Sequence, residues 1–384
     1  MTTPAASVAA PLKKTALNAT HRALNAKMVD FGGWDMPVEY PCPGGGLIAE
    51  HLAVRTAVGL FDVSHMGEIQ FRGPGALAAV QQITMNDASR LHDGQAQYSA
   101  LLTPQGTFVD DILVHRLSPN DYLLVVNAGT TDKDFAWIRQ QVGAWPGIHV
   151  SDYSTYYSQL ALQGPRALDT LKKLTQTDLA AIGKYRFAWG TVAGIPNVLI
   201  ARTGYSGEDG FEVYIPSDQP TTEKMWNALL DAGAQFGIRP CGLGARNTLR
   251  LEAAMSLYGH EISEEINVLE AGLDRWLKLD KGDFIGRQAL LAVQAEGGPK
   301  HKIIGLQMIE RGIARDGYRV LSLDGNPIGR VTSGSPAPFL KTNIALALVP
   351  TAVAAGGDDL LVDVRGNRVR ARQVPLPFYK RAKE

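Results

Sequence analysis

The segment Phe108–Asn127, FVDDILVHRLSPNDYLLVVN, carries the clearest structural signal in the chain. Phe108–Leu117 and Tyr122–Asn127 are dominated by apolar and β-branched residues, which are typical of strands. The four residues between them, Ser-Pro-Asn-Asp, are turn formers. The segment therefore predicts an antiparallel hairpin. A helix is expected after it from Thr131, with Asp134 in the position of a capping-box partner.

The sequence on both sides of this hairpin repeats one design, in which a strand is followed by Gly-Pro and then by a helix. Proline suits the first turn of a helix, because the missing N–H would have no partner there. Two such units hint at a duplicated α+β module. The predicted elements are strand Gly67–Arg72 with helix Ala76–Ile83, and strand Leu160–Gln163 with helix Ala167–Leu174.

The rest of the chain divides at the glycine-rich segment 295–299, which is a plausible linker. Before it we predict strands at 185–192, 198–202 and 210–216, helices at 222–236 and 243–255, and loops through most of the first 65 residues. After it come short strands at 302–308, 318–322, 329–333, 345–349 and 360–364. We therefore expect a core of two α+β subdomains over residues 1–290 and an all-β barrel over 300–384.

Composition excludes several classes of protein. Among the 384 residues, Lys plus Arg and Asp plus Glu both number 38, so a generic nucleic-acid binder with a basic excess is not expected. The only cysteines, Cys42 and Cys241, exclude a disulfide framework and a Cys-rich zinc site. No apolar run is long enough for a membrane span, and the first residues do not resemble a signal peptide. A cytoplasmic protein is expected.

Motifs for nucleotides and metals are also missing from the sequence. No glycine-rich loop ends in Gly-Lys-Ser or Gly-Lys-Thr, and the segment 242–247 lacks the third glycine of a dinucleotide fingerprint. The histidines form no His-Glu-x-x-His pair. We therefore expect neither a nucleotide nor a metal ion.

Asp110 and Asp111 stand next to each other in the hairpin. Side chains alternate across a strand, so Asp110 shares a face with Ile112 and Asp111 shares the other face with Leu113. Both faces are largely apolar, which predicts a strand buried on both sides and a carboxylate in an apolar setting. The alternative is that one aspartate caps a turn and the other is solvated at the end of the strand.

For each of the other candidate residues, a functional and a structural interpretation both stay open. Glu212 is either a ligand contact or a solvent-facing strand residue. Arg246 lies on an apolar helix, where it pairs with an anionic ligand or with a carboxylate. Tyr98 and Asn127 are also candidates, although packing and turn formation would explain them.

Several strings together resemble the T protein of the glycine cleavage system. They cover the chain from about Leu17 to Phe378, and their order makes the resemblance specific. The strings are Met28–Trp34, Ala53–Thr56, Gly59–Met66, Val109–Ile112, Thr203–Glu208, Cys241–Glu252, Asp283–Arg287 and Thr332–Gly334.

The resemblance implies an aminomethyltransferase. Such a protein transfers the one-carbon unit carried by the lipoyl arm of the H protein to tetrahydrofolate, which gives methylenetetrahydrofolate, ammonia and dihydrolipoyl H protein. The implied partners are lipoylated H protein and tetrahydrofolate as co-substrate. The implied fold is α+β, a cloverleaf of three subdomains with mixed or antiparallel sheets, a C-terminal β-barrel and folate in a central channel.

The resemblance also assigns residues. It places the catalytic acid at Asp110 and folate contacts at Glu212, Arg246, Tyr98, Asn127 and Met66. A carboxylate such as Glu212 can accept both the amino group and a ring N–H of a pterin. Asp110 would lie beside the reacting folate nitrogens, where its charge stabilises a cationic iminium. The family's folate-contacting tyrosine near the C-terminus has only a partial counterpart in Tyr379, because the tail of this chain diverges.

Two rival functions stay open. One is a folate-dependent demethylase of a methylated amine or sulfonium on the same scaffold. The other is a non-enzymatic folate-binding protein, whose typical Lys-Gly-Cys-Tyr-x-Gly-Gln string is absent here.

Overall fold

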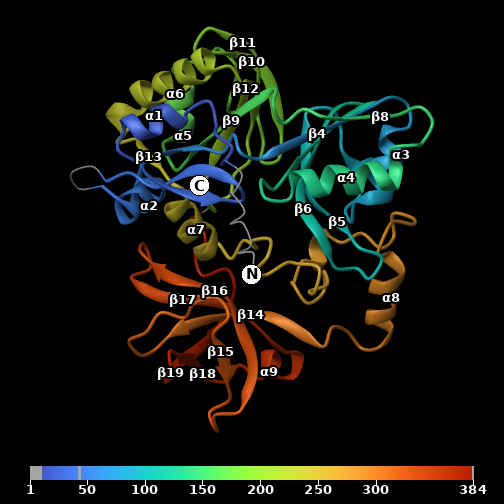
Figure 1. Cartoon of the computed structure of the whole chain (residues 1–384), viewed down its shortest axis with the longest axis vertical. Helices are drawn as coiled ribbons and strands as arrows, with labels where there is room; N and C mark the ends of the chain where they lie inside the picture. Colours follow the sequence, from blue (N-terminus) through green and yellow to red (C-terminus); the bar gives the residue numbers. More distant parts are fainter. Residues whose placement is uncertain (1–10, 42–44, 383–384) are drawn as a thin grey trace, which may run out of the picture.

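The computed structural model describes residues 11–41 and 45–382, which form three lobes around a common centre (Figure 1). Cys42 lies outside these residues, and Cys241 is a buried free thiol. None of the helices in the described residues is long and apolar enough to cross a membrane. The α+β cloverleaf expected from the sequence is confirmed.

The first lobe is built on the predicted hairpin. Its antiparallel sheet has the order β5-β6-β7-β4-β8. The strands are β4 (Gly67–Arg72), β5 (Gln95–Leu102), β6 (Phe108–Ser118), β7 (Asp121–Val126) and β8 (His149–Asp152). Helices α3 (Ala76–Ile83) and α4 (Thr131–Val142) bury apolar side chains against one face of this sheet. The other face is turned toward the second lobe.

The second lobe is a six-stranded sheet of order β10-β11-β12-β9-β3-β13. Its strands are β3 (Gly59–Asp62), β9 (Tyr157–Gln163), β10 (Phe187–Val192), β11 (Ile195–Ala201), β12 (Gly210–Pro216) and β13 (Arg239–Cys241). Only the short β13 runs parallel to its neighbour, β3, among the described strands. Helices α5 (Ala167–Leu171) and α6 (Gln219–Gly233) cover one face, with Trp226 fully buried between helix and sheet.

The third lobe is a closed six-stranded barrel of order β14-β17-β16-β15-β18-β19. The strands are β14 (His301–Met308), β15 (Arg319–Leu321), β16 (Pro327–Ala337), β17 (Thr342–Pro350), β18 (Leu360–Val364) and β19 (Asn367–Val374), with α9 (Thr351–Gly356) beside them. Its interior is apolar. The residue boundaries 1–290 and 300–384 for the domains stay predictions.

Shorter elements join the lobes. Helix α7 (Leu243–Glu252) contacts β16 and β17 of the barrel and also helix α2 (Leu47–Thr56). The remaining elements are α1 (Asn18–Ala23), the hairpin β1 (Lys27–Phe31) and β2 (Trp34–Glu39), α8 (Arg287–Ala295), and the short 3-10 turns η1 (Ala88–Arg90), η2 (Ala234–Phe236) and η3 (Asp274–Trp276). Helix α7 therefore connects the second lobe to the barrel.

The structure corrects several predicted elements. Within the described part of the first 65 residues, 11–41 and 45–65, two helices and three strands accompany the loops, and strand β19 was not predicted. The helix expected to reach Met255 ends at Glu252, because Ala254 adopts a left-handed backbone with φ +52°. Strand β10 begins at Phe187, since Tyr185 is left-handed with φ +57°.

Candidate active site

A cavity of about 260 Å³ lies between the two sheets and beside helix α7. Its walls include strands β5, β6 and β7 of the first lobe and β3, β9 and β12 of the second. Most of the exposed lining is apolar, with a few polar groups converging on it, as is typical of small-molecule sites. Five predicted residues line it: Met66, Tyr98, Asn127, Glu212 and Arg246.

Asp110 does not line this cavity. It lies on the face of β6 that carries Ile112, where its side chain is fully buried. Its carboxylate accepts hydrogen bonds of 2.9 Å from the backbone N–H of Asn127, the Asn127 side-chain amide and the Thr130 hydroxyl. The catalytic role assigned to Asp110 stays a prediction, but the geometry turns its carboxylate away from the cavity.

Asp111 is the acid that faces the cavity. Its carboxylate accepts hydrogen bonds from the Tyr98 hydroxyl at 3.1 Å and from the side-chain amide of Asn127 at 2.8 Å. Burial and the neighbouring charge of Asp110 raise the pKa of Asp111 to about 7. A carboxyl group with that pKa can take up and release a proton near neutral pH.

Glu212 lies on β12 and is nearly buried. It accepts hydrogen bonds from the Thr203 hydroxyl and, at 3.1 Å, from the Gln159 side-chain amide. Burial raises the pKa of Glu212, whereas these two hydrogen bonds and the positive charge of Arg246 oppose the rise. The solvent-facing alternative for Glu212 is therefore wrong.

Arg246 projects from the first turns of α7 into the cavity wall. Its guanidinium lies 4.7 Å from the ring centre of Tyr205. Among the described residues no carboxylate lies within ion-pair distance of it, so its charge is available to a ligand. The acids Asp111 and Glu212 still favour its charged form, while burial lowers its pKa.

The sequence predicted Tyr98 but not Tyr185 and Trp276, two further aromatic side chains that line the cavity. The rings of Tyr98 and Trp276 lie 5.6 Å apart, and those of Tyr185 and Trp276 lie 6.0 Å apart. Such surfaces can stack against a flat ring. Tyr185 comes from a connection before β10 and Trp276 from the short 3-10 turn η3, and neither segment has a periodic pattern that marks a residue as facing inward.

Both parts of the chain match family models. Residues 17–281 match the GCVT N-terminal domain, and residues 301–380 match the glycine cleavage T-protein C-terminal barrel domain. The chain belongs to the glycine cleavage T-protein family. An aminomethyltransferase of Acidobacterium capsulatum is 66% identical over 378 residues, which cover 98% of this chain and 99% of the relative. One of Koribacter versatilis is 60% identical over 98% of each chain.

A solved structure shows the same fold. The crystal structure of glycine cleavage system aminomethyltransferase T from Bartonella henselae matches with a TM-score of 0.88 at 32% identity, over 96% of this chain and 98% of that one. The sequence resemblance to the T-protein family is thereby confirmed. Within residues 11–41 and 45–382, no group of three or more His, Cys, Asp or Glu side chains is arranged to hold a metal ion.

A further buried acid in this T-protein family member, Asp134, differs from its predicted role. Asp134, on α4, was expected to cap its own helix. Instead it is fully buried beside Asp110. Burial and the charge of Asp110 raise the pKa of Asp134 to about 10. Two carboxyl groups in such contact share one proton, because both cannot be charged at low cost.

This proton predicts a pH-dependent effect of Asp134→Asn on stability. The pKa of Asp134 is higher in the folded than in the unfolded chain, so its contribution is complete below about pH 4 and declines as pH rises toward 10. Asparagine needs no proton. We expect the free energy of unfolding of the variant to exceed that of the wild type by on the order of 2–4 kcal/mol at pH 8, with little difference at pH 4.

Urea unfolding at several pH values measures this difference. Asp132 lies on the same helix with 86% of its side chain exposed, so Asp132→Asn is the matched control and should show no such trend. A difference between Asp134→Asn and wild type that does not change with pH would mean that Asp134 holds no proton.

Proposed function

We propose that the chain transfers the one-carbon unit of an aminomethyl group on dihydrolipoyl H protein to tetrahydrofolate. The products are methylenetetrahydrofolate, ammonia and dihydrolipoyl H protein. The observation that carries the proposal is the cavity, in which an acid with a pKa near 7, a buried carboxylate and an arginine without a carboxylate partner among the described residues face one space. The family membership supports the same reaction.

The cavity residues fit a pterin in their chemistry. Glu212 offers acceptors to an amino group and a ring N–H. The Gln159 oxygen is buried and has no donor among the described residues, so it is another acceptor for such a group. The aromatic rings of Tyr98, Tyr185 and Trp276 supply flat surfaces. These features support tetrahydrofolate as the co-substrate, with Met66 as an apolar contact.

Asp111, rather than Asp110, is the acid we assign to the transfer. The overall reaction moves protons from nitrogen atoms of the folate to the leaving ammonia and to the lipoyl sulfur. A carboxylate in the cavity can accept one of these protons, and its charge stabilises positive charge that develops there. Tyr98 and Asn127 hold the two oxygens of Asp111 in place. Asp110 keeps a negative charge nearby and so raises the proton affinity of Asp111.

The direct test is an assay of ammonia release from H protein loaded with the aminomethyl group. We expect release to depend on tetrahydrofolate and to yield methylenetetrahydrofolate in equal amount. Methylated amines and sulfonium compounds serve as alternative donors in parallel reactions. Turnover with those donors, and none with loaded H protein, would favour the demethylase and reject the proposal.

Substituting Asp111 and Asp110 one at a time separates the roles of these two neighbouring acids. Asp111→Asn should lower kcat by about 100-fold or more, the usual scale for a proton-transfer group, while folate binding changes little. In the wild type, kcat should fall as pH drops below about 7, because Asp111 is then protonated. Asp110→Asn should keep turnover and move this fall to lower pH, since it removes the charge that raises the pKa of Asp111.

Steady-state kinetics from pH 5.5 to 9 would reveal both effects. If Asp110→Asn abolished turnover while Asp111→Asn retained it, the catalytic acid would be Asp110, as the family resemblance implied.

Glu212→Ala should weaken folate binding by roughly 1.5–3 kcal/mol, the scale of a hydrogen bond to a charged group. Fluorescence titration with tetrahydrofolate measures the change. Glu265, whose side chain is 77% exposed, provides the control Glu265→Ala, for which no change is expected. An unaltered titration of Glu212→Ala would exclude this residue as a folate contact.

A further inference from the structure

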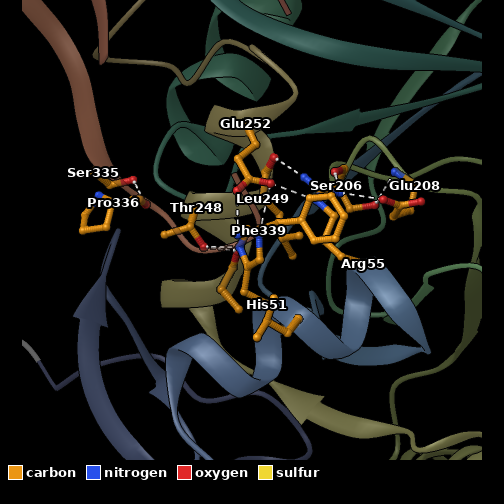
Figure 2. Close-up of polar contacts among 12 residues, drawn as sticks. His51, Arg55, Ser206, Glu208, Thr248, Leu249, Glu252, Ser335, Pro336 and Phe339 are labelled. Atoms are coloured by element: carbon orange, nitrogen blue, oxygen red, sulfur yellow. Dashed lines mark hydrogen bonds and ion pairs between the residues drawn. The ribbon is translucent and has the colours of Figure 1, made fainter. Parts of the chain in front are cut away.

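Arg55 does not line the cavity, but it contacts the loop that forms part of the cavity wall. It is buried in α2, and its guanidinium donates hydrogen bonds to the backbone oxygen of Ser206 at 2.8 Å and to the carboxylate of Glu208 at 2.9 Å. Figure 2 shows these contacts converging on Arg55. The connection between β11 and β12 is thereby fixed at two points.

Other contacts also hold this connection, since the Gln163 amide donates to the Thr203 backbone oxygen at 3.0 Å and the Ser206 hydroxyl donates to Gln163 at 2.7 Å. Arg55 adds the tie to α2 and, through Glu252, to α7.

Residues 203–206 line the cavity but belong to no strand or helix. Gly204 and Gly207 have positive φ angles of +154° and +81°, so the backbone is irregular there. At the cavity end, the hydroxyl of Thr203 donates to Glu212. The loop therefore holds one oxygen of Glu212, while Gln159 holds the other.

The other side of Arg55 is tied to α7 and to the barrel. The Nε of Arg55 donates to the carboxylate of Glu252 at 2.9 Å. The Glu252 carboxylate also accepts a hydrogen bond of 3.2 Å from the backbone N–H of Phe339 (Figure 2). Tyr379, in the tail beyond the last barrel strand, donates its backbone N–H to the Glu252 backbone oxygen at 2.8 Å. The Tyr379 ring lies 4.0 Å from the guanidinium of Arg55.

We propose that Arg55 and Tyr379 are positioning residues for the Glu212 end of the cavity. The Tyr379 ring covers the guanidinium of Arg55 and excludes water from it. The N–H groups of that guanidinium point toward the loop and toward α7. Arg55 then keeps Ser206 and Glu208 in place, and with them Thr203 and Glu212. The consequence for ligand binding rests on the function proposed above, whereas the effect on the loop does not.

The test compares Tyr379→Leu with Tyr379→Phe, which retains the ring. We expect Tyr379→Leu to raise the KM and the dissociation constant for tetrahydrofolate about 10-fold, with kcat within a factor of two of wild type. Tyr379→Phe keeps the ring over Arg55 but loses the hydroxyl that bonds with Glu208, so it should have a clearly smaller effect than Tyr379→Leu on KM and the dissociation constant. Lys380→Ala changes the next, exposed residue and is the control for an unspecific effect of the tail.

Hydrogen exchange tests the loop without any ligand. Amides of residues 203–208 should exchange faster in Tyr379→Leu than in wild type, while those of the barrel strands β18 and β19 stay unchanged. Glu208→Gln, which keeps the shape of the side chain and removes the charge paired with Arg55, should give the same pattern if Tyr379→Leu does not fold.

The outcomes distinguish a failure of the positioning role from a failure of the proposed function. Unchanged exchange of residues 203–208 in the variant that folds, or an equal effect of Tyr379→Phe, would overturn the positioning role. If wild type binds no tetrahydrofolate, the proposed function fails instead, and the exchange experiment still decides the role of Arg55 and Tyr379.

Discussion

The burial of β6 on both faces is the constraint on which the site depends. Two adjacent carboxylates on such a strand must point in opposite directions, and neither can reach bulk water freely. The structure solves this with one side chain, since the amide of Asn127 donates to Asp110 at 2.9 Å and to Asp111 at 2.8 Å. Asp110 is satisfied inside the protein, and Asp111 is left with one face toward the cavity.

Polar side chains are also buried where the lobes meet. The facing surfaces of the two sheets carry Glu212, Gln159 and Asp111, which would be costly to bury without partners. Neighbouring strands and the loop 203–208 supply those partners. The barrel takes part through α7, because Glu252 at the end of that helix is bonded both to Arg55 and to the barrel residue Phe339. The first two lobes thus enclose the cavity between them, and the barrel supports one of its walls through α7.

Much of this could be read from the sequence, and the exceptions have physical causes. Alternation along Phe108–Leu117 correctly separated the faces of Asp110 and Asp111. It could not tell which face would meet the second sheet, because that depends on packing between residues far apart in the chain. The pairing of Tyr98 with Leu113 places Tyr98 on the face of Asp111, and this register is not evident from either strand alone. Local pattern also suggested a cap for Asp134, but a tertiary contact with Asp110 prevailed.

The balance of charge in the cavity explains why Asp111 is suited to its proposed task. Arg246 favours the ionised form of both Asp111 and Glu212, whereas burial and Asp110 favour the protonated form of Asp111. Asp110 can exert this effect only while it is charged itself. Asp110 accepts hydrogen bonds from Asn127 and Thr130, and Asp134 lies beside it with a raised pKa. Asp110, which does not line the cavity, therefore adjusts the proton affinity of Asp111, which does.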